Sequence, residues 1–208
     1  MPYSYTGNFP DQQVANSGIF SPADALNLSS FGEYGGSLEL IEEVNITSDT
    51  AQIDFSNIKQ NKFDVHLLQY ENFKPTTDGQ DVRIRFFESG VLEDASVYQY
   101  AHHLNQTSGA LEQRSTGIAY IRAGVGTGNN TGERAHAYVY FYNLGNNEKY
   151  SFVNYHSVNL NTTTTYGSTF GGAILPQATI VDGIRVYSGG GITTITAKLF
   201  GLKQIWVT

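Results

Sequence analysis

The sequence predicts an all-β fold, an antiparallel β-sandwich of jelly-roll type with an extended N-terminal arm. Apolar and polar residues alternate along much of the chain, which is the period of a strand with one buried face. Residues that suit a pleated sheet are abundant, with 14 Tyr and 12 Phe, and only 15% of the residues are charged. Many of the 22 glycines lie in clusters between the alternating segments, where turns are expected.

The alternation begins after Gly36. Its clearest example is 134–143, where Ala137, Val139 and Phe141 face one way while a histidine and three tyrosines face the other. The expected strands are 37–46, 51–55, 63–72, 82–88, 96–101, 117–122, 134–143, 150–156, 172–179, 180–187 and 192–201.

Turn clusters separate these strands, and they lie at 76–79, 124–132, 143–147 and 188–191. The segment from Asp78 to Asp81 has too few ligands for a calcium loop and is interpreted as a hairpin turn. The glycines at 124–132 precede an expected strand rather than a helix, which indicates a flexible surface loop and not a nucleotide site. The connections differ in length, which favours a jelly roll over an up-and-down barrel.

Residues 1–36 are predicted to form the arm, and residues 37–208 the sandwich domain. The arm contains three of the five prolines and shows no sustained alternation. A short helix is expected after Ser21, its N-cap, with Pro22 in the first helical position. Scattered apolar side chains favour an arm that docks onto a neighbouring subunit or partner, and a disordered leader is the alternative. The candidate anchoring residues are Phe9, Phe20, Leu26 and Leu28.

The acidic balance of the chain excludes some partners. Its formal net charge is −7 and its pI is about 5.1. Such a surface repels phosphate groups and no basic run offsets it, so we expect no nucleic acid and no membrane as direct partners.

No apolar stretch approaches the roughly 20 residues of a membrane helix. Met1–Pro10 lacks the basic and apolar regions of a signal peptide, so we expect synthesis in a cytoplasm without secretion by that route.

The sequence predicts no catalytic, cofactor or metal site, and hence no enzyme. The chain has no cysteine, which excludes disulfides and thiolate ligands. Zinc requires three or four convergent ligands, but His102 and His103 would point to opposite faces of a strand. His136 and His156 would at most be neighbours on paired strands. No nucleophile motif of the GxSxG type occurs. Paired acids for glycoside cleavage would have to converge in a groove, and a glycan-degrading enzyme is the third alternative.

The row formed by Tyr138, Tyr140 and Tyr142 has two interpretations. Tyrosines that point outward can stack on sugar rings or fill a subunit interface, because each is a large, rigid and amphipathic surface. The same row could instead be the second buried face of a central strand. We therefore treat the three tyrosines as candidate interface or glycan contacts.

Three parts of the chain resemble structural proteins of tailed bacteriophages. The first is 35–43 with 51–56, the second runs through 63–68, 72–75 and 77–86, and the third is 180–187 with 189–191 and 195–203. Along these parts the order of features is a strand, a tyrosine, glycines and then a strand that ends in a glycine turn. This order resembles the pattern in jelly-roll-like virion proteins. Those proteins serve as head decoration, cement or tail-fibre components, and the resemblance covers about 37–203.

The resemblance implies a non-enzymatic protein of the virion, assembled in the host cytoplasm. It implies a capsid decoration (cement) protein, a homotrimer whose residues 1–36 hold the major capsid protein or another virion protein. The sandwich would then stabilise contacts between capsomers on the outer head surface. The alternative is a tail or head-fibre module that recognises host surface glycans through the tyrosines and the loop 159–165.

Overall fold

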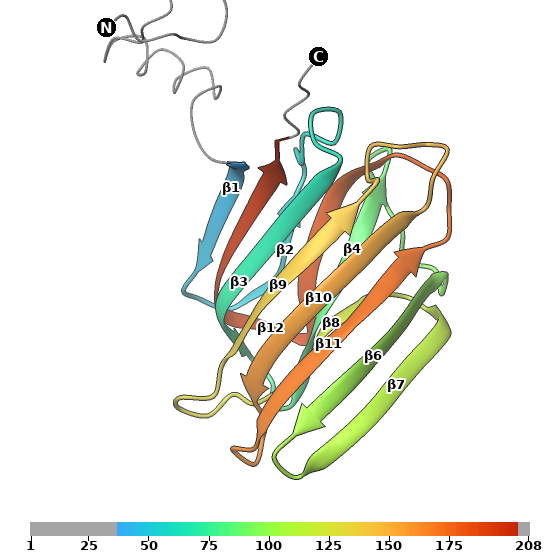
Figure 1. The fold of residues 1–208 in the computed structure, drawn as a ribbon. Coiled ribbons are helices and arrows are strands. Elements are labelled where there is room, and N and C mark those ends of the chain that lie inside the picture. The colour runs from blue at the N-terminus through green and yellow to red at the C-terminus, as the bar shows by residue number, and fades with distance from the viewer. Residues whose placement is uncertain (1–36, 204–208) are drawn as a thin grey trace, which may run out of the picture. The chain divides into compact units, whose positions relative to one another are not determined.

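The computed structural model describes residues 37–203, which form one antiparallel, strongly curled β-sheet shaped as a half-barrel (Figure 1). The prediction of an all-β antiparallel fold is therefore confirmed. This part of the chain contains no helix, and so none that is long and apolar enough to span a membrane. The predicted helix after Ser21 and the anchoring residues of 1–36 lie outside the described residues.

The strands follow the alternation of burial along the sequence. They are β1 (Leu38–Ile46), β2 (Thr50–Phe55), β3 (Val65–Pro75), β4 (Gln80–Glu88), β5 (Val91–Leu92), β6 (Tyr98–Gln106), β7 (Gly109–Ile118), β8 (Ile121–Thr127), β9 (Ala135–Tyr142), β10 (Ser151–Leu160), β11 (Tyr166–Leu175) and β12 (Val181–Leu202).

The longest strand, β12, belongs to both halves of the sheet. Its first part pairs with β2 and β4, and its second part pairs with β3. The pairing register shifts between Tyr187 and Ile192, and the glycines from Gly189 to Gly191 lie at this shift. Gly191 has a φ of +95°, a conformation that glycine adopts without steric cost. The sheet therefore bends at these glycines while its longest strand continues.

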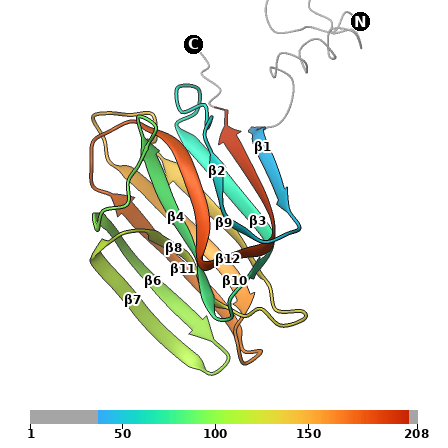
Figure 2. The same cartoon turned by 180° about the vertical axis from the view of Figure 1, so that it is seen from behind.

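The bend places two parts of the sheet against each other. On one side β3, β9, β10, β11, β6 and β7 follow in order, and on the other side β4 carries β5 and β8 (Figures 1 and 2). Strand β8 contacts β9, β10, β11 and β6 across the interior. The core lies between the two parts, where the ring of Phe86 packs 6.0 Å from Tyr98 and 5.8 Å from Phe141 between centroids. The part of the sheet that contains β9, β10, β11 and β6 therefore has one face buried in the core and one face directed outward.

Several sequence-based boundaries are wrong. The expected strand 117–122 spans the end of β7 and the start of β8, and most of β7 was not expected. The expected strand 172–179 covers only the end of β11, and β12 is one strand where two were expected. The long loop expected at 124–132 begins later, because residues up to Thr127 belong to β8.

The hairpin turn expected at Asp78 to Asp81 is also wrong. This segment joins β3 to β4, and these two strands do not pair with each other. Both pair with β12 instead, β3 with its second part and β4 with its first. The segment therefore carries the chain from one half of the sheet to the other beside the glycine bend.

The bend gives a first prediction. Substitution Gly191→Val should destabilise the protein by about 1–3 kcal/mol, because a β-branched residue is strained at positive φ. The added Cβ would also lie 3.1 Å from the carbonyl oxygen of Thr50. Urea unfolding followed by circular dichroism measures the change. Substitution Thr116→Val introduces the same residue at an exposed position of β7 that has no positive φ, and it should stay within about 0.5 kcal/mol of the original protein; equal stability of the two variants would contradict the bend's role.

Candidate functional site

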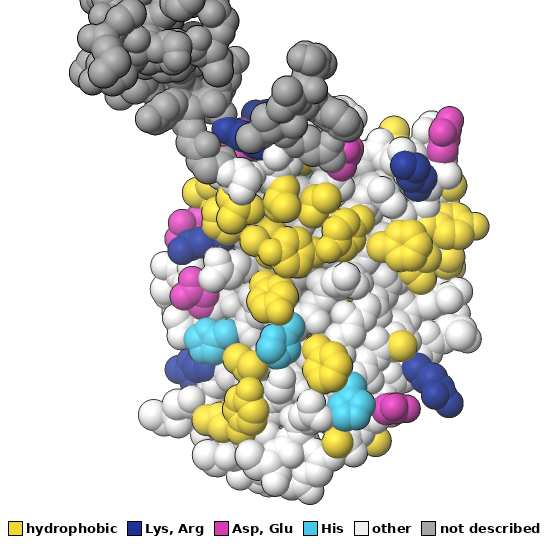
Figure 3. All heavy atoms as spheres, in the orientation of Figure 1, with side chains coloured by type: hydrophobic (Ala, Val, Ile, Leu, Met, Phe, Trp, Pro, Cys, Tyr) yellow, Lys and Arg dark blue, Asp and Glu magenta, His cyan; other side chains and the backbone are white. Residues whose placement is uncertain are grey.

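The outward residues of four adjacent strands, β9, β10, β11 and β6, form a surface that we call the outer face. Exposure alternates along each of these strands, so every second side chain points away from the core. The members of the outer face are His136, Tyr138, Tyr140, Tyr142, Phe152, Asn154, His156, Val158, Leu160, Tyr166, Ser168, Phe170, Gly172, Ile174, Gln99, Ala101, His103 and Asn105. Aspartate, glutamate, lysine and arginine do not occur in this set, and Figure 3 shows charged side chains around the rim instead.

The three tyrosines of the sequence-predicted row lie on the outer face. Tyr138 is 48% exposed, while Tyr140 and Tyr142 are half-buried by their neighbours. The ring of Tyr140 packs 6.0 Å from Tyr138 edge to face and 6.5 Å from Tyr142 in a stacked arrangement. The row therefore lies at the surface of the described residues, as a contact role requires; what it contacts stays a prediction.

Strand pairing extends the row sideways. Tyr138 lies opposite His156, His156 opposite Phe170, and Phe170 opposite His103. The rings of Tyr138 and His156 meet edge to face at 5.6 Å, and those of Phe170 and His103 stack at 5.6 Å. The hydroxyl of Ser168 lies 2.8 Å from Nε2 of His156. Sequence reasoning missed Phe170 and His103 because only long-range pairing brings them to the tyrosines.

A second row is apolar. Val65 lies opposite Tyr142, Tyr142 opposite Phe152, and Phe152 opposite Ile174. Leu67 and Phe200, which are paired on β3 and β12, continue this row. Figure 3 shows hydrophobic side chains as a band across this face. Phe152 is the most prominent member, since 47% of it is exposed.

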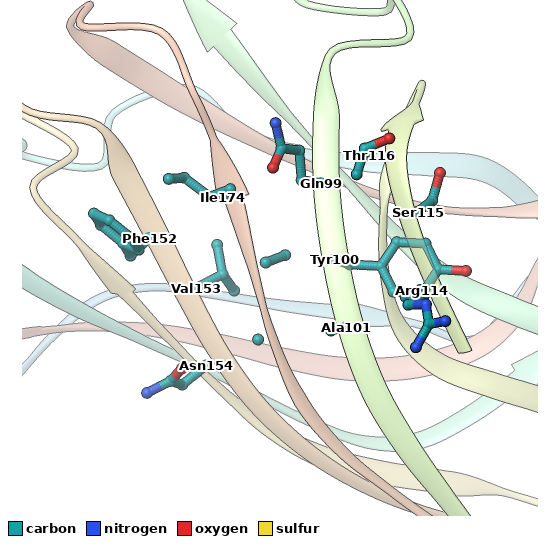
Figure 4. A pocket seen from close by; sticks show the side chains of 12 residues that line it. Gln99, Tyr100, Ala101, Arg114, Ser115, Thr116, Phe152, Val153, Asn154 and Ile174 are labelled. Atoms are coloured by element: carbon teal, nitrogen blue, oxygen red, sulfur yellow. The ribbon is translucent and has the colours of Figure 1, made fainter. Parts of the chain in front are cut away.

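An open groove with a volume of about 720 Å³ lies where this band meets β6 and β7. Ala101 and Gly172 are paired across β6 and β11 and leave space because their side chains are small. Phe152 and Asn154 line one side of the groove and Arg114 of β7 lines the other (Figure 4). The groove thus combines an aromatic ring, an amide and a guanidinium group.

The histidines are placed as the strand pattern predicts. His102 is buried and His103 points outward, which confirms that the two cannot bind one ion together. His136 lies opposite Val158 and His156 opposite Tyr138, so the two are diagonal neighbours on the outer face. Among residues 37–203 no group of histidine, aspartate and glutamate is placed to hold a metal ion.

A buried polar network supports the outer face from inside. His102 lies between the Tyr155 hydroxyl, 2.9 Å from Nδ1, and Oε1 of Gln113, 2.9 Å from Nε2. Arg122 donates a 3.0 Å hydrogen bond to the same Gln113 oxygen and forms an ion pair with Asp81, with Nε and Oδ2 2.9 Å apart. The network connects β6, β10, β7, β8 and β4. Sequence reasoning missed it because its members are distant in the chain.

The network gives a prediction for pH. Burial lowers the pKa of His102 from its ordinary value of 6.5. The unfolded state therefore binds more protons than the folded state just below that value, and stability should fall as the pH drops below about 6.5. Substitution His102→Gln should make this fall smaller. His66, whose pKa burial also lowers, contributes to the remaining fall, and Glu88, whose pKa burial raises, opposes it. Urea unfolding at about pH 7.5 and 5.5 tests this; equal losses in both proteins would contradict it.

Comparisons with known proteins identify no relative. No protein-family model matches the chain, and no curated protein or solved structure is significantly similar to it. The function therefore has to be inferred from the outer face itself.

Proposed function

We propose that this chain is a non-enzymatic structural protein of a bacteriophage particle, a capsid decoration (cement) protein that acts through contact. The observation that carries the proposal is the outer face, where four adjacent strands present aromatic rings and no charged side chain. The centres of protein interfaces are depleted of charge and enriched in Tyr and Phe. The particle as the place of this contact rests on the resemblance of the sequence patterns in 37–203 to virion proteins, which no matching relative supports.

The size of the outer face favours a protein partner. Four strands about 4.8 Å apart and about six residue steps of about 3.4 Å give a patch of roughly 19 by 20 Å, or about 400 Å². A standard interface covers about 800 Å² on each partner. The outer face therefore has the size of the central part of such an interface, and the polar rim would complete it.

The jelly-roll type remains part of the proposal. The bend of β12 supports it, since β2 and β4 lie on one side of the bend and β3 on the other. The anchoring of residues 1–36 to the major capsid protein through Phe9, Phe20, Leu26 and Leu28 stays a prediction, as does the homotrimer.

Charge placed on the outer face should weaken binding to the particle. Substitutions Tyr138→Lys and Phe170→Lys should each weaken binding at least tenfold, because an interface would bury an unpaired ammonium group. Val91→Lys is the matched control, since Val91 is 70% exposed on β5, outside the outer face. The measurement is co-sedimentation of each purified variant with phage heads that lack the protein.

The heads themselves provide the second readout. Heads with the bound protein should release DNA at a higher temperature than heads without it. Equal resistance of the two to heat would contradict the cement role, and antibody labelling on the tail instead of the head would contradict the location.

The groove beside Phe152 favours a second function, recognition of host surface glycans. An aromatic ring beside the amide of Asn154 and the guanidinium of Arg114 suits a sugar ring with polar substituents. Calorimetry of the purified protein with host surface polysaccharide tests this. If the protein is a cement protein, we expect no heat of binding. Binding whose affinity Phe152→Ala lowers at least tenfold would establish glycan recognition instead of the cement role.

A further inference from the structure

Strand β7 forms an edge of the curled sheet. It pairs with β6, and no other strand of residues 37–203 pairs with it (Figures 1 and 2). Most of its ten residues are exposed. Native edge strands are usually short or protected by proline, charged side chains (above all lysine), a β-bulge or a cover, because unpaired N–H and C=O groups attract further strands. The pairing of β7 with β6 shifts register between Ser115 and Ile118, so the strand is regular around Gln113. Between Gly109 and Ile118 there is neither proline nor lysine.

The charges of β7 are arranged symmetrically about Gln113. Glu112 and Arg114 lie opposite His103 and Ala101 on β6, so both point to the same side as the outer face. Both are exposed. In an antiparallel pair, residues directly opposite each other have their Cβ atoms about 5 Å apart, and opposite charges at such positions attract.

One register of self-pairing satisfies these charges. With Gln113 of one copy opposite Gln113 of a second copy, Glu112 faces Arg114 of the second copy, and Arg114 faces its Glu112. Centring the pair on residue 112 or 114 would place like charges opposite each other. Centring it between 113 and 114 would place Glu112 opposite Ser115. The strand therefore carries a charge pattern that is complementary to itself in one antiparallel register.

We propose that β7 is a self-association edge, on which a second copy of this chain pairs antiparallel about a two-fold axis at Gln113. Two reciprocal Glu112–Arg114 ion pairs fix the register, and the backbone groups of the two edges hydrogen-bond to each other. Such a contact is isologous and closes after two copies. It also joins the two curled sheets edge to edge, so the outer faces of both copies continue into one surface.

The net charge of the chain and the exposed Leu111 of β7 are consistent with a second copy of the chain as the partner. The chain has a formal net charge of −7, so two copies repel each other except where local charges compensate. The two ion pairs supply that compensation at the centre of the contact. On the opposite side of the strand, Leu111 is 51% exposed and would lie beside Ser115 of the second copy. The proposal does not depend on the virion role, since it concerns copies of this chain alone.

Charge reversal tests the register. In sedimentation velocity of the full chain, we expect the original protein to form a dimer. Substitutions Glu112→Arg and Arg114→Glu should each weaken dimerisation at least tenfold, because both cross-strand pairs then carry like charges. The double variant should regain the dimer, since it exchanges the two charges. An equimolar mixture of the two single variants should form a heterodimer, because each strand then carries charges opposite to its partner's.

The control is Glu148→Arg, which makes the same change of charge at an exposed position outside β7 and should leave the dimer intact. At a low protein concentration, where every variant is monomeric, thermal unfolding should be unchanged in all of them, because Glu112 and Arg114 are exposed. This dimer and the homotrimer implied by the resemblance to virion proteins exclude each other, unless two trimers pair through β7. An original protein that is a monomer or an isolated trimer would overturn the proposal. A dimer that persists in both single variants would overturn it as well. Neither result would affect whether antibody labels the phage head, so the location on the head and the β7 dimer fail separately, while a dimer would contradict the homotrimer.

Discussion

The structure depends on one strand that is shared by both halves of a single sheet. Strand β12 pairs with β2 and β4 before its glycines and with β3 after them. Because the hydrogen-bonded strand continues through the bend, the sheet curls over itself and encloses a core lined by aromatic rings such as Phe86, Tyr98 and Phe141. The curl leaves the convex side of β9, β10, β11 and β6 without a covering layer among the described residues.

The inward and outward side chains of these four strands differ in kind. Inward, His102 and Tyr155 belong to a polar network that ends in the Arg122–Asp81 ion pair. Outward, the same strands present tyrosine, phenylalanine, histidine and amide side chains. Charged side chains lie at the two margins of this face. On one side Nζ of Lys198 lies 3.8 Å from Oε1 of Glu71, and on the other side β7 carries Glu112 and Arg114. A face that lacks charge within an acidic protein supports our proposal that it is a contact surface.

The sequence predicts those parts of the fold whose pattern is local. Strand 134–143 was evident because its two sides differ, and β9 shows this alternation of burial. Most of β7 was missed because an edge strand with both sides exposed has no such pattern. The start of β11, from Tyr166 to Gly171, resembles a loop in composition. Phe152 and Phe170 join the tyrosine row through pairing between strands distant in sequence, which no single segment reveals.

The most direct test of the contact surface is hydroxyl-radical footprinting of intact phage heads against the free protein. We predict that Tyr138, Phe152 and Phe170 react readily in the free protein and are protected on the head. Exposed apolar residues elsewhere, such as Val91, should react equally in both. Unchanged reactivity of the three aromatic residues, with protection confined to other strands, would contradict the account.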